Sequence, residues 1–199
     1  ICARANGYFF HLYDTSWILD KNTHATLVDI HHYLSDGTLD GCLRTLAFYA
    51  SNRSSSHTKN ILERFQHMLR ETDAREITDT VLINYRSMLS PATEWYLVTI
   101  RGFLRSWHEL GYPGISKEVI RLLDGWTLKG NRKGDAVKRM DPREGPLTDN
   151  ELTAVNEGAI RAYEKSLITI AELAMALSAS HTGRRPIQIS QLRDRKSVV

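Results

Sequence analysis

A chain of 199 residues is long enough for one or two domains with hydrophobic cores of their own. Hydrophobic residues make up 42% and charged residues 25%, which is typical of a globular protein and excludes a largely disordered chain. The net charge of +3 permits a nucleic-acid partner without requiring one, and no stretch approaches the ~18 continuous apolar residues of a membrane span. The first residues lack a basic region followed by a long apolar core, and the two cysteines form no disulfide framework. We therefore expect a cytoplasmic protein without a secretory signal or membrane contact.

The N-terminal segment, residues 1–50, carries mixed signals. Residues 7–20 are rich in aromatic and β-branched side chains and predict one or two short strands or a hairpin. Residues 28–34 are ambiguous between strand and helix. Thr38 lies in a turn and is a candidate cap for a helix over about 39–51.

Residues 51–127 predict a bundle of helices. Apolar residues recur there at helical spacing, and each periodic segment follows serine, threonine or proline residues that favour a helix start. The expected helices cover about residues 57–71, 79–89, 93–110 and 117–123. We therefore expect a chain that is mainly α, with a small β element near its N-terminus.

A polar stretch at 128–146, rich in Gly, Pro, Lys and Arg, predicts an extended linker between two domains. Between residues 129 and 143 six basic residues stand against two acidic ones, an excess larger than the net charge of the whole chain. Thr148 and Glu151 then have the spacing of a capping box, which opens the second domain, residues 147–199.

A long apolar helix, expected at about 159–180, leads into the stretch in which chemistry is concentrated. A glycine turn is followed there by two arginines and Pro186, and proline suits the first position of a helix. Arg185 would then occupy the cap position, beside the free amides of the new helix. A guanidinium group and a helix N-terminus both bind phosphate, so the pattern predicts a phosphate-binding group.

This stretch resembles the first conserved box of the tyrosine recombinases, or phage-type integrases. That box reads Thr-Gly-x-Arg, with an acidic or amide residue three positions after the arginine and a leucine seven positions after it. The matching residues here are Thr182, Gly183, Arg185, Gln188 and Leu192. The upstream order is also similar to the family's, with a helical bundle, a basic linker and a Leu-Thr-x-x-Glu-Leu pattern at 147–152.

The resemblance implies a helical core-binding (SAM-like) bundle at 51–127, followed by the first helices of a tyrosine-recombinase catalytic domain at 147–199. The implied function is DNA binding for site-specific recombination, as in the integration or excision of a mobile element. In the family a tyrosine attacks a DNA phosphate to form a 3′-phosphotyrosine link, without a metal or nucleotide cofactor. The implied partners are double-stranded DNA and other protomers, which assemble as a tetramer on paired sites.

By this resemblance Arg185 is the catalytic arginine, whose guanidinium supports negative charge on the phosphate oxygens in the transition state. Thr182, Gly183 and Gln188 would support it, with Gly183 allowing a turn in which a side chain would clash. The family more often has an acid at Gln188, so an ionic hold on the arginine is not expected. Contacts to DNA are expected from basic residues of two bundle helices and the linker, with a solvated surface as the alternative for each. These are Lys59, Arg64, Arg101, Arg105, Lys129, Arg132, Lys133, Lys138 and Arg139.

All eight tyrosines precede Arg185, and no His-x-x-Arg box follows it. The family's nucleophile lies downstream of both, so we expect this chain to be the front part of a recombinase, inactive alone in DNA cleavage. Two alternatives remain: a non-catalytic helical DNA-binding regulator, or a helical protein-interaction module with an incidental basic linker. His24, His31 and His32 lack further ligands at metal-binding spacing, so no metal site is expected.

Overall fold

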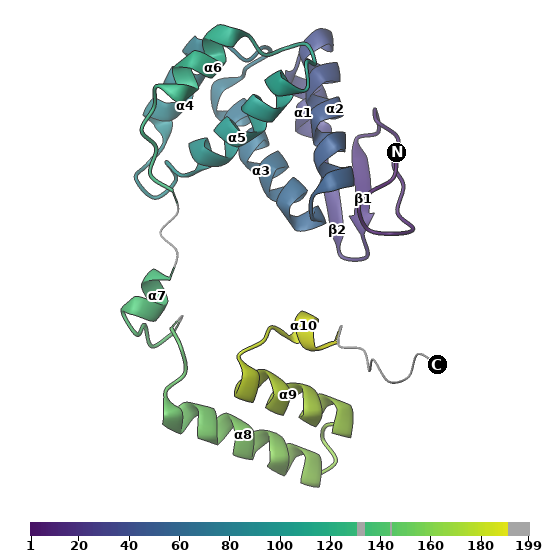
Figure 1. The fold of residues 1–199 in the computed structure, drawn as a ribbon, viewed down its shortest axis with the longest axis vertical. Coiled ribbons are helices and arrows are strands. Elements are labelled where there is room, and N and C mark those ends of the chain that lie inside the picture. The colour runs from purple at the N-terminus through teal and green to yellow at the C-terminus, as the bar shows by residue number, and fades with distance from the viewer. Residues whose placement is uncertain (131–133, 144, 191–199) are drawn as a thin grey trace. The chain divides into compact units, whose positions relative to one another are not determined.

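The computed structural model describes residues 1–130, 134–143 and 145–190, and for Asp135 and Ala136 the backbone alone. The described chain is mainly helical and contains a two-stranded sheet, as the sequence predicted (Figure 1). It divides into two compact units, Ile1–Asn131 and Arg132–Val199. No helix in the described residues is long and apolar enough to cross a membrane.

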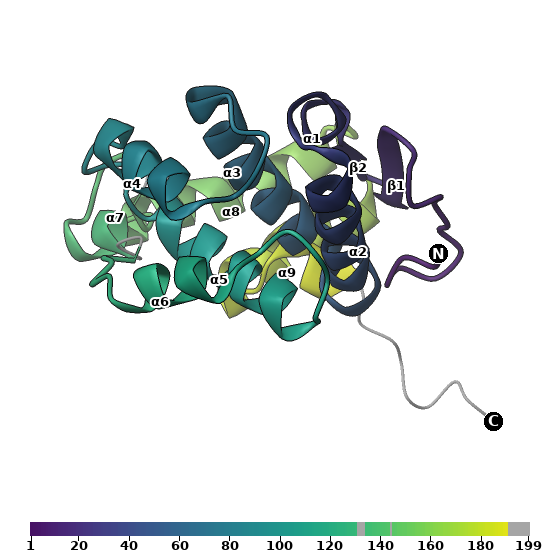
Figure 2. The same ribbon diagram turned by 90° about the horizontal axis from the view of Figure 1, so that it is seen from above.

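The first unit opens with an antiparallel hairpin of β1 (Ser16–Asp20) and β2 (Thr23–Thr26). The hairpin confirms the expected β element, although its second strand lies after the predicted residues 7–20. Trp17 and Leu19 alternate with exposed residues along β1 and are buried, which is the pattern of a strand with one face on a core. Figures 1 and 2 both show the hairpin at the end of the unit away from α4 and α6.

Helices make up the rest of the first unit. They are α1 (Val28–Tyr33), α2 (Asp36–Asn52), α3 (Ser55–Thr72), α4 (Asp79–Met88), α5 (Tyr96–Glu109) and α6 (Lys117–Asp124). The ambiguous residues 28–34 are thus mostly helical, and α2 to α6 match the expected helices to within a few residues. Ser54, Thr78 and Ser116 cap their helices, because each side chain accepts a hydrogen bond from the backbone amide three residues later.

The expected cap at Thr38 is wrong. The amide of Leu39 donates to the carbonyl of Ser35 over 2.7 Å, so α2 begins one turn earlier than predicted. Thr38 lies inside the helix with only 6% of its surface exposed.

One hydrophobic core holds the first unit together. Trp107 is fully buried in it, donates its indole N–H to the carbonyl of Pro113 over 2.9 Å and packs edge-on against Phe65. Residues of the hairpin belong to the same core as residues of α6. The expected domain boundary at residue 50 is therefore wrong, because that residue lies inside α2 and the N-terminal segment supplies part of the bundle's core.

The second unit contains α7 (Asp135–Lys138), α8 (Asp149–Glu164), α9 (Ile170–Thr182) and α10 (Pro186–Ser190). The capping box predicted at Thr148 is confirmed, since its hydroxyl accepts from the amide of Glu151 and the carboxylate of Glu151 accepts from the amide of Thr148. The expected extended linker contains α7, in which the amide of Lys138 donates to the carbonyl of Gly134 over 2.9 Å.

The single long helix expected at 159–180 is wrong, because α8 and α9 are separate helices joined by a turn. Thr169 and Glu172 form a second capping box, with both reciprocal hydrogen bonds present. Ser166, within the turn, has φ of 56° in the left-handed region. The bonds from the amide and hydroxyl of Thr169 lower the pKa of Glu172, so the capping carboxylate stays ionised.

Candidate nucleic-acid interface

The stretch around Arg185 is built from two consecutive helix ends. Helix α9 ends at Thr182, and Gly183 follows as its C-terminal cap with φ of 63°. Gly183 has the left-handed backbone in which a side chain would clash with its own main chain, as expected. A Cβ there would meet no other part of the described chain within 4 Å, so the constraint is the backbone conformation and not crowding by neighbours.

Gln188 holds the backbone of Arg185 rather than its guanidinium. Helix α10 begins at Pro186, as predicted, which leaves Arg185 immediately before it. The side-chain oxygen of Gln188 accepts from the amide of Arg185 over 3.1 Å. Thr182 holds the backbone of the preceding arginine in a similar way, because its hydroxyl accepts from the amide of Arg184 over 3.3 Å. The two polar residues of the box thus fix the direction of the backbone that carries both arginines.

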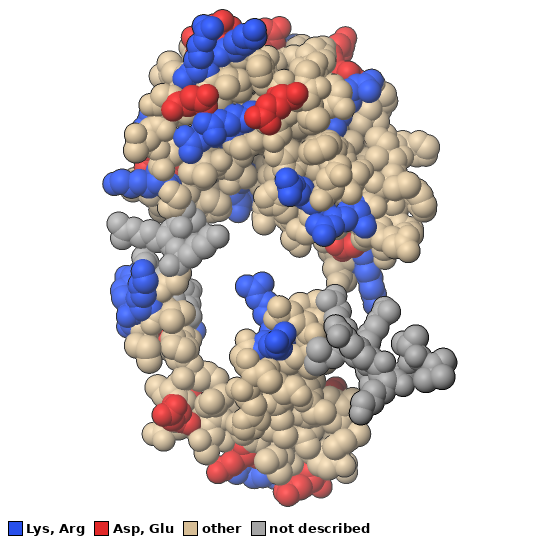
Figure 3. All heavy atoms as spheres, viewed as in Figure 1, with Lys and Arg blue, Asp and Glu red and all other residues tan. Residues whose placement is uncertain are grey.

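The side chains of Arg184 and Arg185 are exposed, and within the described residues neither forms an ion pair. Figure 3 shows Lys and Arg side chains beside the α9–α10 connection without an adjacent acidic one in that view. Two guanidinium groups without acidic partners can each offer paired N–H donors to an anion such as a phosphate. Leu192, the last residue of the box, lies outside the described residues.

The expected DNA contacts of the linker are only partly described. Lys129 and Lys138 have exposed side chains, and Arg139, also exposed, follows α7 directly. Arg132 and Lys133 lie outside the described residues.

The bundle arginines are engaged within the protein. The guanidinium of Arg64 lies 5.0 Å from the ring centroid of Trp95 and 4.6 Å from that of Tyr96, and only 22% of the side chain is exposed. This is the geometry of a cation–π contact. The arginine therefore joins α3 to the start of α5.

Two further arginines on α5 tie that helix to the region around α6. Arg101 donates to the backbone carbonyl of Trp126 over 3.1 Å. Arg105 contacts the carboxylate of Asp124 through two nitrogens, with the Nε contact at 2.8 Å. Lys59, by contrast, is half-buried beside a small hollow that it shares with His24, Glu63 and Gln66.

A basic group that sequence reasoning missed lies at the junction of α2 and α3. Arg4, Arg53 and His57 line the same hollow there. Arg53 stands directly before the Ser54 cap, which is a visible signal, because a basic residue beside a free helix N-terminus is a phosphate-binding pattern. The proximity of Arg4, 49 positions earlier, has no such local signal.

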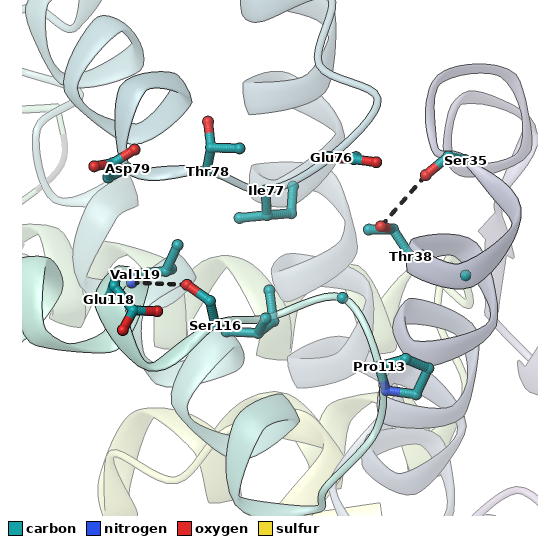
Figure 4. Close-up of a pocket in the computed structure, with 13 residues that line it drawn as sticks. Ser35, Thr38, Glu76, Ile77, Thr78, Asp79, Pro113, Ser116, Glu118 and Val119 are labelled. Carbon is teal, nitrogen blue, oxygen red and sulfur yellow. Dashed lines mark hydrogen bonds between the residues drawn. The ribbon is translucent and has the colours of Figure 1, made fainter.

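A hollow of about 750 Å³ elsewhere on the first unit has the opposite charge (Figure 4). It is lined by Ser35, by the caps Thr78 and Ser116, and by three acidic residues, which are Glu76, Asp79 and Glu118. Hydrogen bonds from its own backbone amide and from Ser116 lower the pKa of Glu118, which keeps it charged. These carboxylates repel phosphate, so this face does not suit a nucleic acid.

No three His, Cys, Asp or Glu side chains gather at metal-binding distance within residues 1–130, 134–143 and 145–190. Comparison with known proteins finds no matching protein-family model, no matching curated protein and no matching solved structure.

Proposed function

We propose that this chain is the DNA-binding portion of a site-specific tyrosine recombinase. The first unit would be its SAM-like core-binding bundle, and the second unit would be the start of its catalytic domain. The observation that carries the proposal is the box at 182–188, in which a left-handed glycine and a capping glutamine fix the backbone of an exposed Arg185.

The local geometry supports a role for Arg185 in phosphate chemistry. Its backbone is fixed by Gln188, and its guanidinium is not paired with an acid of the described chain. An unpaired guanidinium carried on a fixed backbone can stabilise the charge that develops on a phosphate during attack by a tyrosine. The neighbouring Arg184 has the same charge, but it occupies the variable position of the box and not that of the conserved arginine.

The distribution of charge supports a polyanionic partner for the second unit. Residues 1–131 contain fourteen basic and fourteen acidic residues, whereas residues 132–199 contain twelve basic and nine acidic ones. The whole excess of positive charge therefore belongs to the part of the chain that carries the box. Contacts between Lys or Arg and DNA phosphates release counterions, so binding should weaken steeply as salt is raised.

We expect the full chain to bind a short double-stranded DNA in a salt-dependent manner. Fluorescence anisotropy of a labelled duplex, titrated between about 50 and 200 mM KCl, should give a log K that falls linearly with log[KCl]. Replacing Lys129 and Lys138 with glutamine should make that negative slope shallower, by about 0.9 for each phosphate that the protein no longer neutralises. A chain that fails to bind the duplex at the lowest salt would rule out the proposed function.

The catalytic assignment of Arg185 requires a form of the protein that carries the nucleophilic tyrosine. In that form Arg185→Ala should abolish covalent protein–DNA adducts on denaturing gels while leaving duplex affinity nearly unchanged. Arg184→Ala is the matched control and should keep its adducts. Equal adduct yields from the two variants would contradict the role given to Arg185.

A further inference from the structure

Basic side chains from two distant parts of the sequence meet at the start of α3. Arg4 from the N-terminal segment joins Arg53 and His57 around a hollow of about 390 Å³, which Tyr49 and Ser54 also line. All of these lining residues are neutral or basic, and both arginines are exposed. Within the described residues neither arginine forms an ion pair, in contrast to Arg105 in the same unit.

The backbone that carries Arg4 is fixed against the end of α2. The amide of Arg4 donates to the carbonyl of Ala50 over 2.8 Å, and the hydroxyl of Ser51 donates to the carbonyl of Cys2 over 2.7 Å. An isolated antiparallel β-bridge pairs the backbones of Cys2 and Phe9 and closes the N-terminal segment on itself. The position of Arg4 beside the hollow is therefore set by hydrogen bonds on both sides of it.

The wall of the hollow is equally well fixed. Tyr49 is 8% exposed, and its hydroxyl lies 2.9 Å from that of Ser106 on α5. The ring of Tyr49 also lies 5.9 Å from that of His57. The wall of the hollow is therefore preformed, and only the exposed side chains of Arg4 and Arg53 lose rotamer freedom when a ligand binds.

The start of α3 brings no acidic side chain to the hollow. Ser54, which lines it, caps the helix by accepting from the amide of His57 over 3.3 Å. The first turn of α3 contains no acidic residue, and Asp20, which interacts with Ser55, does not line the hollow.

We propose that this hollow binds a phosphodiester group of a nucleic-acid backbone, held chiefly by the guanidinium groups of Arg4 and Arg53. The inference rests on the proposed function for its partner, and it adds a binding site that includes the N-terminal segment. It also assigns the phosphate contact to arginines that the fold leaves without acidic partners, rather than to Arg64 on α3.

The test is duplex binding by the full chain with Arg4→Gln, Arg53→Gln and the double variant. The double variant should bind at least about tenfold more weakly, as expected for the loss of charge-assisted hydrogen bonds. Its salt slope should be smaller by about 0.9, which corresponds to one phosphate. Arg53→Lys keeps the charge and should retain most of the affinity, which a merely structural role would not predict.

Arg75→Gln is the matched control. It makes the same change of charge as each single variant, at an exposed residue beyond the other end of α3, a helix whose 18 residues span about 27 Å. Its affinity should stay within about twofold of the wild type, as is usual for a distant surface substitution. If the double variant loses no more affinity than Arg75→Gln, the site is overturned while DNA binding stands. If the wild-type chain does not bind the duplex, both proposals fail.

Inorganic phosphate distinguishes a nucleic-acid site from a pocket for free phosphate. At matched ionic strength, phosphate should displace the duplex no better than chloride does. A free phosphate ion binds weakly, because it lacks the further phosphates through which a DNA backbone contacts the protein. The assignment to nucleic acid would be overturned if phosphate displaced the duplex from the wild-type chain much more strongly than chloride does, and if the double variant did not show this difference.

Discussion

Replacing Gly41 with alanine is expected to destabilise the first unit by about 3 kcal/mol or more. Gly41 lies on the buried face of α2, where a Cβ would come 1.9 Å from the carbonyl oxygen of Pro113 and 2.6 Å from the indole nitrogen of Trp107. These two atoms form a hydrogen bond with each other at 2.9 Å, so the added methyl group would separate them. Because the nearer atom is backbone, it cannot rotate away, and the ~1 kcal/mol that alanine gains in helix propensity is too small to compensate.

Gly102 provides the opposite case within the same unit. It lies on the exposed side of α5, and a Cβ there would meet no atom within 4 Å. Gly102→Ala should therefore stabilise the unit by about 0.5 to 1 kcal/mol through helix propensity alone. Urea unfolding of the full chain, monitored by tryptophan fluorescence, gives the unfolding midpoint and the free energy of unfolding of both variants. A midpoint for Gly41→Ala at or above that of the wild type would contradict the close approach of α2 to Trp107 and Pro113.

Helix starts can be predicted from the sequence wherever a local side chain decides them. Serine or threonine residues are expected before the helices at about 57, 79 and 117, and Thr148 before the next one. In the structure Ser54, Thr78, Ser116 and Thr148 each accept from an amide three residues later. The box at Thr169 obeys the same chemistry but escapes prediction, because the apolar residues on either side of it resemble one continuous helix. Capping chemistry is a strong local signal here, although it failed at Thr38, which lies inside α2. Apolar periodicity alone does not show where one helix ends.

The partners of the arginines could not be predicted, because tertiary packing selects them. Arg64 meets aromatic rings more than 30 residues away, and Arg105 meets Asp124 from the following helix. A sequence pattern gives the helix on which a basic residue lies but not the residue that neutralises it. For Gln188 the pattern does identify a supporting residue, and the structure adds that the amide of Arg185 is the group it holds.

Amide hydrogens of α8 and α9 are expected to exchange at least about a thousandfold faster than those of α3 and α5. Leu173 alone is buried among the described residues of the second unit, whereas α3 and α5 bury residues along most of their length. Burial of apolar surface is the main term that opposes local opening. The core helices should therefore exchange only through global unfolding, which costs about 5 to 15 kcal/mol in ordinary domains.

Hydrogen–deuterium exchange of the full chain, resolved by NMR or by peptide mass spectrometry, measures this difference directly. The capping boxes at Thr148 and Thr169 stabilise the ends of α8 and α9 by only about 1 kcal/mol each, so they should not remove it. Helix α9 is nonetheless rich in Ala, Leu and Met, and a helix of that composition is normally covered. Protection of α8 and α9 equal to that of α3 at every protein concentration would contradict the low burial of the second unit. Protection that rises with concentration would show that a second copy of the chain covers α9.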